Sequence, residues 1–189
     1  IDGFIGPEPF NQRAVATGAG RIFTLTKELW SGHPCCSIAM SKEWRTAHPE
    51  KARRITAALT QASQMANDPA QKDQVAEILS REKYLNQKRE LFLPTLAGTY
   101  QNWEGEEKTD HERISFGNPT NPTAITWMAT QLARWNLGGD TLTMDDPTLI
   151  HLADSVLPDD VPRGGDPVTI NGRVFDAHTP TAGYEVYTR

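Results

Sequence analysis

A helical repeat begins at Pro49 and sets the class of fold that this chain can adopt. Apolar side chains recur there at helical spacing: Ala52, Ile55, Leu59, Ala62 and Met65. Pro49 suits the first position of a helix, and an acidic residue beside it, Glu50, is favourable in the first turn. Further helices are predicted after Asp68-Pro69, over 87–96, over 123–135, and from Asp146-Pro147 to about residue 157.

Strand signals precede this helical region. Residues 2–5 form a short apolar run that leads into a Gly/Pro turn, and residues 22–25 and 36–40 also read as strands. A short helix is expected over 10–19, a turn around Trp30, and a long surface loop over 101–122. Asn171-Gly172 predicts a hairpin within 168–175, because a type I′ turn needs positive φ at both central positions. The pattern indicates an α/β chain with strands early and helices late.

Composition excludes two broad classes of function. The 189 residues carry a net charge of −5, and no basic stripe is present, so nucleic-acid binding is not expected. Mean hydropathy is −0.54, and no run approaches the ~18 apolar residues of a membrane span, so a soluble chain is expected. Because the sequence opens on Ile1, we expect a chain that was processed or cut from something longer.

The two cysteines, Cys35 and Cys36, are adjacent and therefore cannot link distant parts of a fold. The favoured interpretation is a pair of small buried apolar side chains beside a cleft. Alternatives are direct contact with a solute, a vicinal disulfide, a soft-metal site with His33, or a catalytic thiol with His33 as base. No metal and no cofactor are expected.

Five short segments, in order and at similar spacing, carry a resemblance to a known family. They are Gly-Phe-Ile-Gly-Pro-Glu-Pro-Phe-Asn at 3–11, Glu-Leu-Trp-Ser-Gly-His-Pro at 28–34, Thr-Trp and Ala-Arg-Trp within 126–135, Asp-Asp-Val-Pro at 159–162, and Gly-Arg-Val-Phe-Asp at 172–176. Together they resemble the nitrate- and bicarbonate-binding, NMT1-like receptors of ABC transporters, over nearly the whole chain.

The resemblance implies the C-terminal portion of a type II periplasmic-binding-protein fold, in which solute sits between two lobes. The chain would then be a single partial unit, with crossover and cleft segments at 1–40, a helical part at 41–157, and a hairpin and tail at 158–189. It also implies a non-enzymatic receptor that hands a small anionic solute to an ABC permease. Such a protein is expected in the periplasm or lipid-anchored at the membrane surface, with peripheral membrane association through the permease or the anchor.

The resemblance further assigns a ligand-binding set. Its members lie in the two opening turns and just after them: Gly6, Pro7, Glu8, Asn11, Trp30, His33, Cys35 and Cys36. A small planar anion needs a few fixed donors, and backbone N–H groups in a turn can provide them. Two departures matter. Pro7, which has no N–H, stands where the family has Gly, and Cys35-Cys36 replace the Glu-Lys whose ammonium meets the anion.

Other interpretations stay open at this stage. Glu8 can instead pair with a surface arginine such as Arg13, and Trp30 can fill the core. The same fold also serves a cytoplasmic nitrate-sensing regulator and an enzyme of thiamine-precursor synthesis. A secretion signal would favour transport over sensing, and turnover that depends on Cys35 or Cys36 would favour the enzyme.

Overall fold

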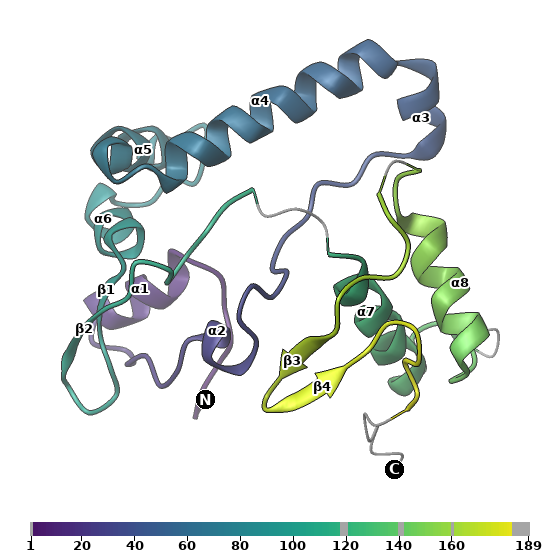
Figure 1. The fold of residues 1–189 in the computed structure, drawn as a ribbon. Helices are drawn as coiled ribbons and strands as arrows, with labels where there is room; N and C mark the ends of the chain where they lie inside the picture. Colours follow the sequence, from purple (N-terminus) through teal and green to yellow (C-terminus); the bar gives the residue numbers. More distant parts are fainter. Residues whose placement is uncertain (1, 118–120, 140–141, 160, 183–189) are drawn as a thin grey trace. The chain divides into compact units, whose positions relative to one another are not determined.

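A computed structural model describes residues 2–117, 121–139, 142–159 and 161–182. The chain divides into two compact units. Residues 1–25 and 35–118 make up the first unit, and residues 26–34 and 119–189 make up the second (Figure 1). Within the described residues, no helix is long and apolar enough to span a lipid bilayer.

The first unit is mainly helical. Its helices are α1 (Phe10–Ala16), α3 (Lys42–Ala47), α4 (Pro49–Asn67), the 3-10 turn η1 (Pro69–Gln71), α5 (Lys72–Ser80) and α6 (Arg89–Ala97). Pro49 occupies the first turn of α4, as predicted. Asp68 then accepts a hydrogen bond from the Ala70 backbone N–H at 2.9 Å, which caps η1. The hydrogen bond from Gln71 and then that from Ala70 lower the pKa of this carboxyl below its usual value. The predicted helices after Pro49 and Asp68 are therefore confirmed.

Helix α6 ends at a glycine that no other residue can replace easily. Gly98 has φ +80°, and its carbonyl accepts from the Asp110 N–H at 2.8 Å. A Cβ added at Gly98 would collide with the Asp110 carbonyl. The close approach brings β1 (Thr99–Gln101) and β2 (Glu107–Thr109) together as an antiparallel hairpin.

This hairpin corrects the prediction of an unbroken loop over 101–122. Both strands are short and largely polar, so their sequence carries no apolar alternation to reveal them. Asn102 stabilises the turn, because its side-chain oxygen accepts from the N–H groups of Glu104 and Glu106 at 3.1 and 2.9 Å.

The predicted order of strands early and helices late is wrong. Among the described residues, the first strand begins at Thr99, whereas helix α1 begins at Phe10. Residues 2–5 and 36–40 are coil, and residues 22–25 contribute only one isolated parallel bridge, between Ile22 and Asn102. An extended segment becomes a strand only when a neighbour pairs with its backbone over several residues, and in the described structure these segments have no more than the single bridge at Ile22.

The second unit contains three helices and a hairpin among its described residues. They are α2 (Thr26–Leu29), α7 (Pro122–Arg134), α8 (Asp146–Val156), β3 (Val168–Ile170) and β4 (Arg173–Phe175). Asn171 and Gly172 have φ +49° and +75°, so the predicted hairpin turn is confirmed. Asn121 caps α7 and Asp145 caps α8, each through its side-chain oxygen. Hydrogen bonds from Thr143 and then Thr148 lower the pKa of Asp145.

Trp30, Ala124, Ile170 and Phe175 form the core cluster of this unit. The buried face of α7 is lined by small side chains and threonines: Thr123, Ala124, Thr126, Ala129 and Thr130. Helical spacing in the sequence predicts instead that Ile125, Met128, Leu132 and Trp135 share one apolar face. Of these, Met128, Leu132 and Trp135 are exposed.

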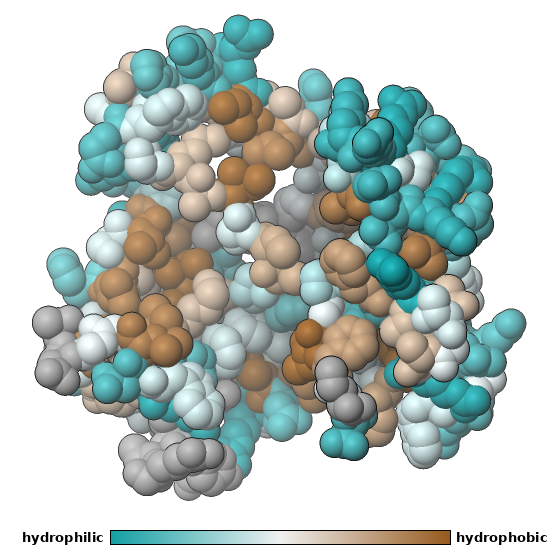
Figure 2. Space-filling view, turned by 180° about the vertical axis from the view of Figure 1, so that it is seen from behind, coloured by the Kyte–Doolittle hydropathy of each residue, from teal (hydrophilic) through white to brown (hydrophobic). Residues whose placement is uncertain are grey.

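Large apolar side chains also reach the surface in both units. Figure 2 shows such brown patches among teal polar residues. Phe23 and Ile38 in the first unit and Leu137 in the second are more than half exposed. Isolated exposed apolar residues are ordinary in folded proteins and do not by themselves indicate a binding surface.

Candidate functional site

The turn at residues 6–9 leads directly into α1 and is held by its own backbone. The Phe10 N–H donates to the Pro7 carbonyl at 3.1 Å, and the Asn11 amide donates to the Gly6 carbonyl. Within the described residues, the backbone N–H groups of Gly6 and Glu8 have no acceptor. These two donors are the ones that the sequence offered to an anion.

The Glu8 side chain does not face the solvent. One carboxylate oxygen is 2.6 Å from Arg113 Nη2, and the side chains are 12% and 0% exposed. The other oxygen accepts from the Gln12 N–H at 3.2 Å and from Thr95 Oγ1 at 3.4 Å. A buried carboxylate needs this kind of pairing, because an unpaired charge away from water is costly.

Arg113 extends this arrangement to the hairpin. Its Nη1 donates to the Thr99 carbonyl at 2.6 Å, and its guanidinium lies 5.3 Å from the centre of the Tyr100 ring. Arg113 therefore connects the opening turn to β1, whereas Thr95 connects the Glu8 carboxylate to α6. The alternative pairing of Glu8 with Arg13 is not present, since Arg13 is exposed and donates to Gln87 at 3.3 Å.

The second predicted turn lies in the second unit. Trp30 follows α2, is 8% exposed, and meets Trp127 edge-on with ring centres 5.1 Å apart. His33 has partners on both ring nitrogens, since Nδ1 is 3.1 Å from the Trp30 carbonyl and Nε2 is 2.9 Å from Thr26 Oγ1. Trp30 is thus a core residue, as one of the two sequence interpretations had it, and contact of either residue with a solute stays a prediction.

Cys35 and Cys36 are not the buried side chains that the sequence favoured. Both are exposed free thiols, and their sulfur atoms are 3.7 Å apart. The reason is that residues 35–39 are exposed coil rather than a buried strand. The hydrogen bond with Cys36, then burial, then the charge of Cys36 raise the pKa of the Cys35 thiol above its usual value.

The structure therefore places the predicted ligand set in two units. Gly6, Pro7, Glu8 and Asn11 come together in the first unit, which also contains the two cysteines. Trp30 and His33 belong to the second unit. That both turns border one solute site stays a prediction.

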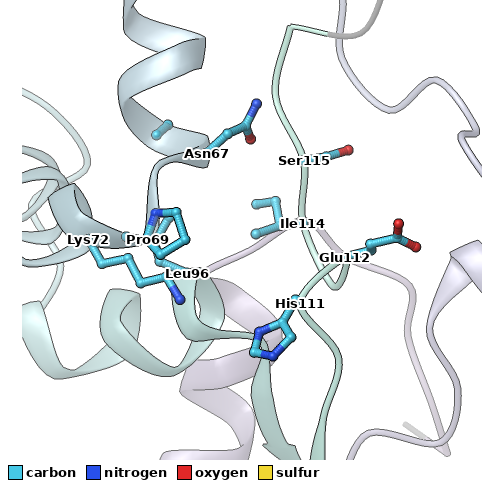
Figure 3. Close-up of a pocket in the computed structure, with 9 residues that line it drawn as sticks. Asn67, Pro69, Lys72, Leu96, His111, Glu112, Ile114 and Ser115 are labelled. Atoms are coloured by element: carbon cyan, nitrogen blue, oxygen red, sulfur yellow. The ribbon is translucent and has the colours of Figure 1, made fainter.

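A cavity of about 240 Å³ lies elsewhere in the first unit. Its walls come from the ends of α4 and α6, the start of α5 and the segment after β2, and Figure 3 shows the lining side chains: Ala66, Asn67, Pro69, Lys72, Leu96, His111, Glu112, Ile114 and Ser115. The Asn67 side chain holds the segment after β2, because its Nδ2 donates to the Phe116 carbonyl and its Oδ1 accepts from the Phe116 N–H. None of the predicted ligand residues lines this cavity.

No group of three or more His, Cys, Asp or Glu side chains comes together among the residues that the structure describes. Asp160 of the predicted Asp-Asp-Val-Pro motif and the last seven residues of the predicted tail lie outside them.

Comparison with curated proteins gives a consistent set of relatives. The nitrate import ATP-binding protein NrtC of Synechococcus elongatus is 32% identical over 72% of this chain and 21% of its own length. The bicarbonate transport ATP-binding protein CmpC of the same organism is 31% identical over 71% of this chain and 20% of its own. The nitrate/nitrite binding protein NrtA of Nostoc sp. is 28% identical over 77% and 34%. The matched part of the chain thus spans about a fifth to a third of the length of these relatives.

Among solved structures, the periplasmic nitrate-binding protein NrtA from Synechocystis superposes with a TM-score of 0.79 at 22% identity. The match covers 96% of this chain and 52% of that protein, so it confirms the predicted α/β periplasmic-binding-protein fold. Residues 1–80 match the model of the NMT1-like family. The resemblance drawn from the sequence motifs is thereby confirmed: the chain is homologous to the nitrate-binding NrtA proteins and matches the NMT1-like family over residues 1–80.

Proposed function

We propose that this chain is part of the solute-binding component of an ABC transporter that captures a small anion of the nitrate, bicarbonate or sulfonate class. The observation that carries the proposal is the structural likeness to a periplasmic nitrate-binding protein over 96% of the chain. The names of the relatives, which are binding and import proteins for nitrate and bicarbonate, support it. The partner would be an ABC permease, and the location the periplasm or the membrane surface.

The solute site is proposed at the opening turn of the first unit, and Trp30, His33, Cys35 and Cys36 are each proposed as further solute-contacting residues. The unpaired N–H groups of Gly6 and Glu8 are suitable donors for an anion, since a turn can direct successive N–H groups at one ligand. Arg113 holds Glu8 and so fixes the backbone of this turn. The Glu8 carboxylate is therefore proposed to position the turn, while the Glu8 backbone N–H is proposed to donate to the solute.

The identity of the solute is a separate question. Cys36 stands where the resembling family has the lysine that meets the anion, and a neutral thiol gives no charge–charge attraction. A different cation, or a solute other than nitrate, would then complete the site.

Thermal unfolding of the full-length protein with nitrate, nitrite, bicarbonate and sulfonates tests the proposal. A ligand at 100 times its Kd adds about 2.7 kcal/mol to the free energy of unfolding. Asn11→Asp should abolish that gain, because it replaces an amide beside the donors with a negative charge. Gln61→Glu, on the exposed face of α4, makes the same charge change away from the turn and should keep the gain. If none of these anions stabilises the protein, the proposed function is wrong.

The sensing regulator remains a second candidate because of one observation. Several relatives are named ATP-binding proteins, and the matched segment makes up about a fifth of their length. Such a segment would sense the solute rather than deliver it. The location of the full-length protein separates the two, since delivery requires export and sensing requires retention. Turnover that depends on Cys35 or Cys36 would instead favour the enzyme.

A further inference from the structure

The two thiols of Cys35 and Cys36 are accessible and face one another. They are the only cysteines of the chain, both are exposed, and their sulfur atoms are 3.7 Å apart. The coil on which they lie gives neither thiol a buried environment. An adjacent pair of this kind can act as a chelate, because both sulfur atoms can bond one atom between them.

The separation of the sulfur atoms fits such a chelate. If both sulfur atoms bond one common atom at about 2.3 Å, their separation of 3.7 Å corresponds to an angle of about 107° between the two bonds at that atom. This angle suits a tetrahedral or pyramidal centre and excludes a linear one. Thiolates are soft ligands, so the centre should also be soft.

The surroundings limit the kind of centre further. A closed zinc site needs four ligands, and the described residues bring no third His, Cys, Asp or Glu to this pair. A centre that needs only two protein bonds and carries a substituent of its own therefore fits this pair of thiols. Trivalent arsenic in an organoarsenical meets this requirement.

We infer that Cys35 and Cys36 form a two-thiol binding site for a thiophilic centre of the trivalent organoarsenical class. With an arsenoso compound, two S–H bonds break, two As–S bonds form, and the oxygen leaves as water with both protons. Arsenic stays trivalent and no thiol is oxidised, so no oxidant or reductant is needed. The inference goes beyond the proposed function, since it concerns the thiols alone and requires no bound anion.

Phenylarsine oxide is the probe for this site. The full-length protein is reduced with a phosphine, treated with one equivalent, and analysed by intact mass and by peptide mass around residues 35–36. We expect one phenylarsenic group with the loss of two thiols at this peptide. The adduct should survive excess monothiol and dissociate with a dithiol. In a parallel sample, Zn²⁺ added to the reduced protein should be removed from the two thiols by a weak chelator, because two ligands do not make a closed zinc site.

The variants Cys35→Ser and Cys36→Ser are the matched controls, because each leaves one thiol at the same place. Each should lose the adduct in monothiol at least tenfold faster than the unmodified protein. The inference is overturned if the reduced pair takes up no probe, or if either single variant retains it as well. Anion-dependent stabilisation is measured on the untreated, unmodified protein, so failure of the thiol site and failure of the proposed receptor function are distinguishable.

Discussion

At the scale of single residues, Glu8 and Arg113 decide the shape of the opening turn. The two side chains are almost fully withdrawn from water and bond at 2.6 Å, while Thr95 and the Gln12 N–H occupy the second carboxylate oxygen. Removal of one member would leave the other as a buried charge without its partner.

We therefore expect Arg113→Met to reduce the free energy of unfolding by about 3–5 kcal/mol, measured by urea denaturation. Arg13→Met is the matched control, because Arg13 lies on the helix that follows the same turn and is exposed. That substitution should change stability by no more than about 0.5 kcal/mol. Equal losses in the two variants would contradict the assigned role of Arg113.

The Cys35 thiol provides a second prediction at this scale. Its pKa is raised first of all by the hydrogen bond with Cys36, so Cys36→Ala should lower that pKa toward the ordinary value. The alkylation rate of Cys35, followed by peptide mass across a pH series, should then rise at a lower pH than in the unmodified protein. If the pH midpoint of Cys35 alkylation is the same in Cys36→Ala and in the unmodified protein, the Cys36 sulfur does not raise the pKa of Cys35.

Sequence reasoning found one half of the Glu8 pair and missed the other. Glu8 stands out because it lies between two prolines, whereas Arg113 follows a polar hairpin and has no distinguishing neighbours. The two residues are 105 positions apart, and a single sequence carries no signal for a pair at that separation. The exposure of the cysteines was missed for a related reason, since burial of 36–40 required a strand partner that the described structure does not supply.

At the scale of elements, local signals were predictive and pairing was not. Pro49, Asp68 and Asn171-Gly172 act through their own backbone and nearest neighbours, and all three marked real boundaries. The early strands depended on partners elsewhere and are absent from the described residues. The predicted apolar face of α7 is not its buried face. Threonines fill the buried face instead, and the hydroxyls of Thr123 and Thr130 donate to backbone carbonyls.

The Asn121 cap of α7 allows a test of one such local signal. Its side-chain oxygen accepts from the Thr123 N–H at 3.0 Å, so Asn121→Ala should cost about 1 kcal/mol in thermal or urea unfolding. Asn121→Ser keeps an acceptor at the same position and should cost much less. If serine and alanine are equally destabilising, the side-chain hydrogen bond does not stabilise the helix.

At the scale of the whole molecule, the chain builds two units from interleaved segments. The second unit takes residues 26–34 from the early part of the chain and combines them with residues after 118. Phe175 is 1% exposed and packs in the same cluster as Trp30, so this cluster joins the two segments.

Loss of the Phe175 ring should therefore destabilise the protein strongly. Phe175→Ala removes a fully buried aromatic side chain, and we expect a loss of about 3–5 kcal/mol in the free energy of unfolding. Val174→Ala, one position earlier on β4 and 62% exposed, is the control and should have an effect below about 0.5 kcal/mol. A small effect at Phe175 would mean that this cluster is not a core.

The interleaving has a consequence for biosynthesis. Trp30 leaves the ribosome well before the residues that bury it, because the chain must be extended past Ala124 and then to Phe175 before its cluster can close. Until then the Trp30 indole of the nascent chain is exposed without its native packing partners, and chaperones bind apolar groups that are exposed in this way. Slow translation between these positions would lengthen that vulnerable interval.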